Sequence, residues 1–409
     1  MRFVAFWLAL ILVSPLVAQD KQFFFQKGDR VVFLGDSITE QYQYSTDIEL
    51  YLTTRFPGWN LVFLNAGIGG DTANGGAGRF QSHVLDEKPT AVTINFGMND
   101  AGYGKFDAGR NKQYVEKTTA MLDMAKKAGV RVALISPNAV DRRGRENFKL
   151  YVETQKEFYA PLKELAATHG ATFVDQYATT RAALEKMEQD KADKVVPFGD
   201  GFHTASPGGL LMAHAILTGL GAPAKVSDVS IDAGAKSAAP DHCKVENLMV
   251  AADHVRFDRT DEAVPIPVQK DWVTLLPYVN ELKDLNYYGL TVKGLAKGIW
   301  GISIGGVEVA KASADDLEKG INLGNVTRGP IWEQGKKAFD AINAKNQIVH
   351  GRFRGVLMVQ VPDWLADVAK ERKPLELSKR LEQVAAKQAE IYKMVQPATQ
   401  KFDLKLINQ

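Results

Sequence analysis

Residues 30–40 decide the fold, and they read Arg-Val-Val-Phe-Leu-Gly-Asp-Ser-Ile-Thr-Glu. The run 31–34 is an uninterrupted series of β-branched, aromatic and aliphatic side chains, which is typical of a strand buried on both faces. The chain then leaves the strand through a glycine and polar residues. The same pattern, a short apolar run followed by small and polar residues, recurs along the first two hundred residues.

The further apolar runs are separated by stretches long enough for helices. They occupy residues 61–64, 91–96, 132–135 and 171–174. Between them, 110–128 and 147–168 repeat their apolar side chains with helical spacing. This alternation predicts right-handed crossovers and a parallel, doubly wound sheet of five strands with helices on both faces. In such sheets, chemistry gathers at the carboxyl ends of the strands.

Small and polar clusters follow the first three runs, and one more comes after the fifth. They are Gly35-Asp36-Ser37, the loop 65–72 that contains Gly70, Gly97-Met98-Asn99-Asp100, and Asp200-Gly201-Phe202-His203. Because the carboxyl ends of parallel strands lie along one edge of a sheet, we expect the four clusters to meet there.

The residue types in these clusters suit acyl transfer. A serine hydroxyl needs a base, and His203 can accept the Ser37 proton while Asp200 orients the ring. The amides of Ser37 and Gly70 and the side-chain NH2 of Asn99 can donate to a developing oxyanion. Taken singly, each cluster also suits a helix cap, a turn or a metal half-site. Their order along one sheet favours chemistry.

Taken together, the four blocks resemble those of the SGNH, or GDSL, hydrolase family. The resemblance covers about residues 28–222 and implies a flavodoxin-like three-layer α/β/α sandwich with strand order 2-1-3-4-5. It implies Ser37 as the nucleophile, His203 as the base and Asp200 as its partner, with Ser37, Gly70 and Asn99 forming the oxyanion hole. No metal or other cofactor is required. The chain looks similar to secreted bacterial members with a C-terminal appendage.

The first residues have the pattern of an export signal. Arg2 is followed by an apolar run over 3–13, which is too short for a membrane span, and then by Pro15 and a small residue at Ala18. We therefore interpret 1–18 as a signal peptide, with an uncleaved anchor as the alternative. The expected location is secreted or periplasmic, with no integral membrane span after cleavage.

The second half follows a different pattern. Residues 19–222 form the expected catalytic domain, and 223–325 contain short β-like runs that predict a compact β-rich appendage. Within it, Gly305-Gly306 separates two runs as a hairpin loop does. Residues 326–409 are expected to be a C-terminal helical segment, docked on the catalytic domain or on a second copy rather than on a membrane. The tryptophans of this half (Trp272, Trp300 and Trp332) are expected in the core.

Composition narrows the class of protein. The 409 residues are 45% hydrophobic and 24% charged, which is typical of a globular chain. Fifty basic and 48 acidic residues leave a net charge of +2, which argues against a nucleic-acid partner held by bulk electrostatics. With Cys243 as the single cysteine, no intramolecular disulfide can form. Composition does not determine the oligomeric state.

Two substrate classes compete for the same catalytic residues. One is an acetyl esterase acting on polysaccharide or small-molecule esters, which export and the β-rich appendage favour. The other is a lysophospholipase or thioesterase acting on longer acyl chains. The loop 101–106 after Asn99 is expected to shape this pocket. A hypothesis from another class is a catalytically silent glycan-binding or scaffold protein, which the complete set of block residues disfavours.

Overall fold

The apolar runs of the first two hundred residues form one parallel sheet, as predicted. In the computed structural model, which describes residues 22–144 and 148–408, its strands lie in the order 2-1-3-4-5, as the resemblance implied. They are β2 (Val62–Gly67), β1 (Arg30–Gly35), β3 (Ala91–Asn95), β4 (Arg131–Ile135) and β5 (Thr172–Val174). The expected signal peptide, 1–18, lies outside the described residues.

The register of the central strands brings their carboxyl ends level. Gly35, the last residue of β1, lies opposite Gly67 on one side and Asn95 on the other. The polar clusters that follow these three residues therefore begin at the same edge of the sheet.

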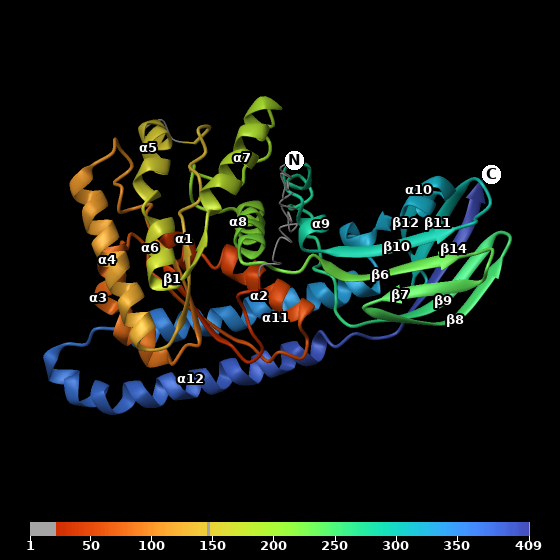
Figure 1. Cartoon of the computed structure of the whole chain (residues 1–409). Coiled ribbons are helices and arrows are strands. Elements are labelled where there is room, and N and C mark those ends of the chain that lie inside the picture. The colour runs from red at the N-terminus through yellow and green to blue at the C-terminus, as the bar shows by residue number, and fades with distance from the viewer. Residues whose placement is uncertain (1–21, 145–147, 409) are drawn as a thin grey trace, which may run out of the picture.

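Helices cover both faces of this sheet. In Figure 1, α3, α4 and α6 lie on one side, and α2 and α8 lie on the other. The helices of this α/β layer are α1 (Ser37–Glu40), α2 (Gln43–Arg55), α3 (Ala73–His83), α4 (Ala108–Lys127), α5 (Lys149–Tyr159), α6 (Leu162–His169), α7 (Gln176–Gln189) and α8 (Ser206–Gly219), with a 3-10 turn at Leu85–Glu87. The predicted three-layer α/β/α sandwich is confirmed.

Beyond Pro223 the chain builds a β-rich unit from two sheets. One has the order β13 (Ile321–Asn322), β10 (Tyr287–Lys293), β6 (Lys225–Asp232) and β7 (Ser237–Asp241). The other has the order β12 (Val307–Ser313), β11 (Ile299–Ile304), β14 (Gln400–Asn408), β9 (His254–Asp261) and β8 (Cys243–Ala251). Short helices connect the strands: α9 (Glu281–Asp284), α10 (Ala314–Lys319), and 3-10 turns at Leu276–Tyr278 and Leu323–Asn325.

The β-rich unit contains the predicted hairpin. Strands β11 and β12 pair antiparallel, and Gly305 and Gly306 between them have φ angles of +58° and +83°, which glycine adopts without a Cβ penalty. Trp300 is buried in the core of this unit, as expected. Trp272 is buried in the other core, and the partly buried Trp332 donates its indole N–H to the Val268 carbonyl at 2.9 Å.

The end of the chain differs from the expected helical segment 326–409. Helices α11 (Pro330–Arg352) and α12 (Ala366–Met394) are present, with a π-helix at Phe353–Leu357 and a 3-10 turn at Asp363–Leu365 between them. Residues 400–408, however, form strand β14, which lies between β11 and β9. The reason is visible in its alternation: Phe402 and Leu404 point into the β core while their neighbours face outward.

Helices α11 and α12 dock on the α/β layer, as expected, and α12 runs beneath it in Figure 1. The buried Lys345 ammonium of α11 forms an ion pair with Glu49 of α2, and the Leu61 amide donates to the Tyr392 hydroxyl of α12 at 2.9 Å. Across the described part of the chain, every helix is too short or too polar to span a bilayer.

Candidate functional site

Ser37 begins α1 immediately after β1, because the chain turns sharply at the edge of the sheet. Gly35 permits this turn: a Cβ there would lie 2.2 Å from Thr39 Oγ1 and 2.7 Å from the Asn95 carbonyl. Asp36 caps the helix, and its carboxylate accepts from the Ile38 amide at 3.0 Å. Burial, together with the nearby acids Asp100 and Asp71, raises the pKa of Asp36 to about 7 against the pull of its amide donors.

His203 lies directly beside Ser37, although 166 positions separate them in the chain. Ser37 Oγ is 2.8 Å from His203 Nε2, and His203 Nδ1 is 2.8 Å from Asp200 Oδ2. The other oxygen of Asp200 accepts from the amides of His203 (2.9 Å) and Phe202 (3.3 Å), so the carboxylate is fixed from two directions. Partial burial acts to raise the pKa of Asp200, but the hydrogen bonds from His203 and these amides lower it overall.

The loop that carries His203 is tied to the helix that carries Ser37. Gln41, directly after α1, uses its side-chain carbonyl to accept from the amide of Thr204 at 3.1 Å and from its hydroxyl at 3.0 Å. The Ser37 and His203 side chains are thus positioned against each other by their immediate neighbours.

Gly70 and Asn99 follow the level ends of β2 and β3. Gly70 has φ +74°, and its amide donates to no acceptor within residues 22–144 and 148–408. Asn99 donates one side-chain N–H to the Asp71 carbonyl at 2.9 Å, which leaves its second N–H available. Asp100 accepts from the amides of Ala73 (2.9 Å) and Gly97 (3.0 Å), which connects both loops, and burial raises its pKa to about 6.

Two residues that sequence reasoning missed hold these loops. The Tyr103 hydroxyl donates to Asn99 Oδ1 at 2.6 Å, so the amide group of Asn99 has a defined orientation. Arg79 donates to Asp71 (2.8 Å) and to the carbonyls of Ala66 (2.7 Å) and Gly35 (3.2 Å), which joins the end of β1 to the end of β2 and the loop that follows it. Tyr103 lies in the loop 101–106 that was expected to shape the pocket. Arg79 has no comparable sequence signal.

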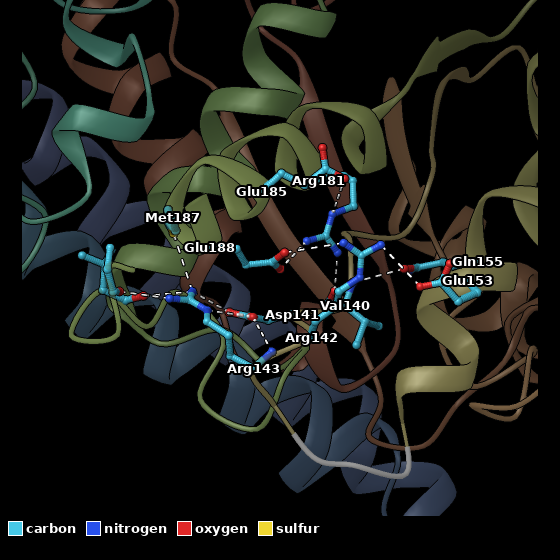
Figure 2. A network of polar contacts seen from close by, with 12 residues as sticks. Val140, Asp141, Arg142, Arg143, Glu153, Gln155, Arg181, Glu185, Met187 and Glu188 are labelled. Atoms are coloured by element: carbon cyan, nitrogen blue, oxygen red, sulfur yellow. Dashed lines mark hydrogen bonds and ion pairs between the residues drawn. The ribbon is translucent and has the colours of Figure 1, made fainter. Parts of the chain in front are cut away.

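Figure 2 shows a polar network around Asp141 and Arg143, and the backbone of Asp141 connects this network to the segment that carries Asp200 and His203. The Asp141 amide donates to the Gly201 carbonyl at 2.7 Å. The buried Asp141 carboxylate is held by Arg143 through both oxygens, at 3.0 and 2.8 Å. Arg181 donates to the neighbouring Val140 carbonyl at 2.9 Å. Residues 140–143, held in turn by Arg181, therefore fix one side of the His203 loop.

Comparison with known proteins agrees with this geometry. The GDSL-like Lipase/Acylhydrolase family matches residues 33–208. The uncharacterized lipoprotein YqeF of Bacillus subtilis is 32% identical over 106 residues, which is 25% of this chain and only 43% of that protein. An acetylxylan esterase of Geobacillus stearothermophilus is 23% identical over 216 residues, 47% of this chain and 94% of that enzyme.

A solved structure extends the similarity beyond the α/β layer. A gut microbial diltiazem-metabolizing enzyme superposes with a TM-score of 0.80 at 25% identity, covering 95% of this chain and 100% of that one. The β-rich unit and the terminal helices thus recur together with the α/β layer. Residues 33–208 thus match the GDSL-like lipase/acylhydrolase family, and the similarities together support an ester-bond hydrolase.

Proposed function

We propose that this hydrolase is a serine esterase that removes acetyl groups from carbohydrate through an acyl-enzyme on Ser37. The observation that carries the proposal is the continuous link from Ser37 Oγ through the His203 ring to Asp200, with 2.8 Å at each step. The His203 side chain is 32% exposed, so an ester at Ser37 can reach it from solvent.

The reaction follows from the roles these atoms can take. His203 Nε2 accepts the Ser37 proton as Oγ attacks the ester carbonyl, and Asp200 stabilises the imidazolium. The oxyanion accepts from the Ser37 and Gly70 amides and from the free N–H of Asn99. Collapse breaks the ester C–O bond, and His203 returns its proton to the departing alcohol. Water then attacks the acyl-enzyme by the same route and releases the acid.

Similarity to a carbohydrate esterase supports the acetyl assignment. The Geobacillus relative is an acetylxylan esterase, and the match spans 94% of that enzyme. Removal of longer acyl chains is the competing outcome, which a substrate series can separate.

The proposed site of action is outside the cytoplasm. The support is the signal-like pattern of 1–18 and the similarity to a lipoprotein. N-terminal sequencing of the protein recovered from the cell envelope or medium tests it: a mature chain beginning near Gln19 is expected, and an intact cytoplasmic chain would refute export.

The first test concerns the nucleophile. Ser37→Ala is expected to abolish hydrolysis of nitrophenyl acetate and labelling by a fluorophosphonate, because it removes the hydroxyl that lies beside the His203 base. Ser82→Ala, an exposed serine on α3, is the matched control and should keep both. Asn99→Ala should lower kcat roughly 100- to 1,000-fold. Full activity of Ser37→Ala would refute the assignment.

The second test concerns the substrate. The wild-type protein is assayed on nitrophenyl esters of increasing acyl length and then for acetate release from acetylated xylan. A sharp preference for acetate with release from the polymer supports the proposal. A preference for eight carbons or more would replace it with the lysophospholipase or thioesterase alternative.

A further inference from the structure

A residue outside the family-matched segment, Arg354, contacts the helix that carries Ser37. Arg354 lies on the π-helix Phe353–Leu357, which continues α11. π-helical turns are rare and occur frequently at functional sites. Phe353 and Val356 of the same turn are buried, whereas Arg354 is exposed, with 39% of its side chain accessible.

The contact of Arg354 is with the helix that carries Ser37. Its Nε lies 2.8 Å from Oε1 of Glu40, the last residue of α1. The second oxygen of the same carboxylate, Oε2, accepts from the Gly69 amide at 2.5 Å. One carboxylate thus joins three parts of the molecule: the nucleophile helix, the glycine loop and the C-terminal helical segment.

The hydrogen bond between Glu40 and the Gly69 amide restricts the orientation of the adjacent Gly70. Both glycines are exposed, and neither has a side chain that could pack the loop in place. The loop is otherwise held by backbone bonds from Ile68 to Gly35 (3.1 Å) and from Asp71 to Ile68 (3.2 Å), and by the bonds of Asp71. Since Gly70 follows Gly69 directly, the Glu40 bond limits how far its amide can turn.

Arg354 is itself anchored to the layer. The neighbouring Arg352 donates to Glu87 at 2.7 Å and to the Leu377 carbonyl at 3.1 Å, and the buried Lys345 pairs with Glu49. The π-helix therefore presents Arg354 from a fixed position. A counter-ion in that position holds the Glu40 carboxylate toward Gly69, and charge-assisted hydrogen bonds are stronger than neutral ones.

We propose that Arg354 is a positioning residue of the esterase site, holding the Gly70 amide toward the oxyanion through Glu40 and Gly69. This inference rests on the proposed function. On this inference, the C-terminal helical segment contributes to the geometry of the oxyanion hole.

The test uses full-length Arg354→Gln, Arg354→Lys and Glu40→Gln. The control is Arg372→Gln, because that arginine of α12 is exposed and its ion pair is with the adjacent, equally exposed Glu371. We expect Arg354→Gln and Glu40→Gln each to lower kcat on nitrophenyl acetate about tenfold, with KM and the melting temperature nearly unchanged. Arg354→Lys should recover part of the loss, and the Arg354→Gln/Glu40→Gln double variant should be no worse than either single variant.

The outcomes separate this inference from the proposed function. If Ser37→Ala is inactive but Arg354→Gln keeps wild-type kcat, the positioning role is wrong and the esterase assignment stands. A rise in KM alone would make Arg354 a substrate contact, and a loss of kcat that follows melting temperature would make it merely structural; either result overturns the inference. If Arg354→Gln does not fold, Arg354→Lys and Glu40→Gln carry the same test.

Discussion

The terminal helices and the β-rich unit both extend the α/β layer, but they are held by different means. Helices α11 and α12 share the layer's core: Ile342 and Ile391 belong to the same buried cluster as Val31 of β1. The β-rich unit has a core of its own, around Trp300 and Phe402. Distance along the chain is therefore a poor guide to which parts form one structural unit.

The connection between the layer and the β-rich unit is mainly polar at its start. The buried Arg55 of α2 donates to the carbonyls of Pro223, Lys225 and Leu285. Residues of the connecting stretch, including Trp272 and Leu275, then pack into the core of the layer. We accordingly expect substitutions in the two extensions to affect activity unequally.

The largest expected effect is loss of the ion pair between α11 and α2. Burial raises the pKa of Glu49 and lowers that of Lys345, each partly offset by the other's charge. Lys345→Met leaves Glu49 without its partner and should cost about 3–5 kcal/mol of unfolding free energy, with esterase activity lost in the same transition. Urea unfolding followed by fluorescence and by activity measures both.

The control for this variant is Lys345→Met/Glu49→Leu. Apolar replacement of both partners is often nearly neutral, so the double variant should recover most of the stability. If activity survived after α11 had unfolded, the shared core would not be a single cooperative unit.

The next effect concerns Asp36, a buried acid at the edge of the sheet where Ser37 begins α1. Because the pKa of Asp36 is raised to about 7, the folded state keeps its proton to higher pH than the unfolded state does. Its contribution to stability is therefore full below about pH 4 and is lost as pH rises through about 7. Asp36→Asn preserves the helix cap and should flatten this fall by as much as about 4 kcal/mol between pH 4 and 8.

Thermal unfolding across that pH range checks this prediction. The change should appear in the transition of the layer, since Asp36 is buried there. Asp86→Asn, at an exposed position on the same layer, should leave the pH profile as in wild type. An unchanged slope in Asp36→Asn would contradict the assignment.

The smallest effect on activity is expected from the β-rich unit. Buried Arg259 donates to Asp261 (2.8 Å), the Gly289 carbonyl (2.9 Å) and Ser227 (2.8 Å). Arg259→Met should destabilise this unit by about 2–3 kcal/mol, which is less than the usual cost of removing one partner of a buried ion pair. The reason is that Asp261 keeps the hydroxyl donors of Ser227 and Tyr288.

Arg259→Met is tested by two measurements: the temperatures of its unfolding transitions, recorded by calorimetry, and its kcat at 25 °C. If the first unfolding transition moves to a lower temperature while kcat is unchanged, the two cores unfold separately. A parallel loss of kcat would mean that the two units unfold together.

Much of the fold could be predicted from local sequence patterns. The five apolar runs, the helical spacing between them and the Gly305-Gly306 hairpin were all visible without distant contacts, because strand and turn preferences act over a few residues. Strand β14 was missed, although its alternation is visible, because the charged helix preceding it dominated the interpretation and its partners β9 and β11 lie about 100–150 positions earlier.

The sequence alone determined which polar residues would meet, since the ends of successive parallel strands reach one edge whatever the rest of the chain does. Ser37, Gly70 and Asn99 could therefore be selected by position, whereas Asp200 and His203, which follow α7 rather than a strand, were selected by their spacing and by the resemblance to the SGNH family. Only the tertiary structure decided which charges are buried and paired. Lys345 and Glu49 are 296 positions apart, and Arg354 resembles any other surface arginine until the docking of α11 brings it to Glu40. Such pairings depend on desolvation and on contacts between distant elements, which no local pattern encodes.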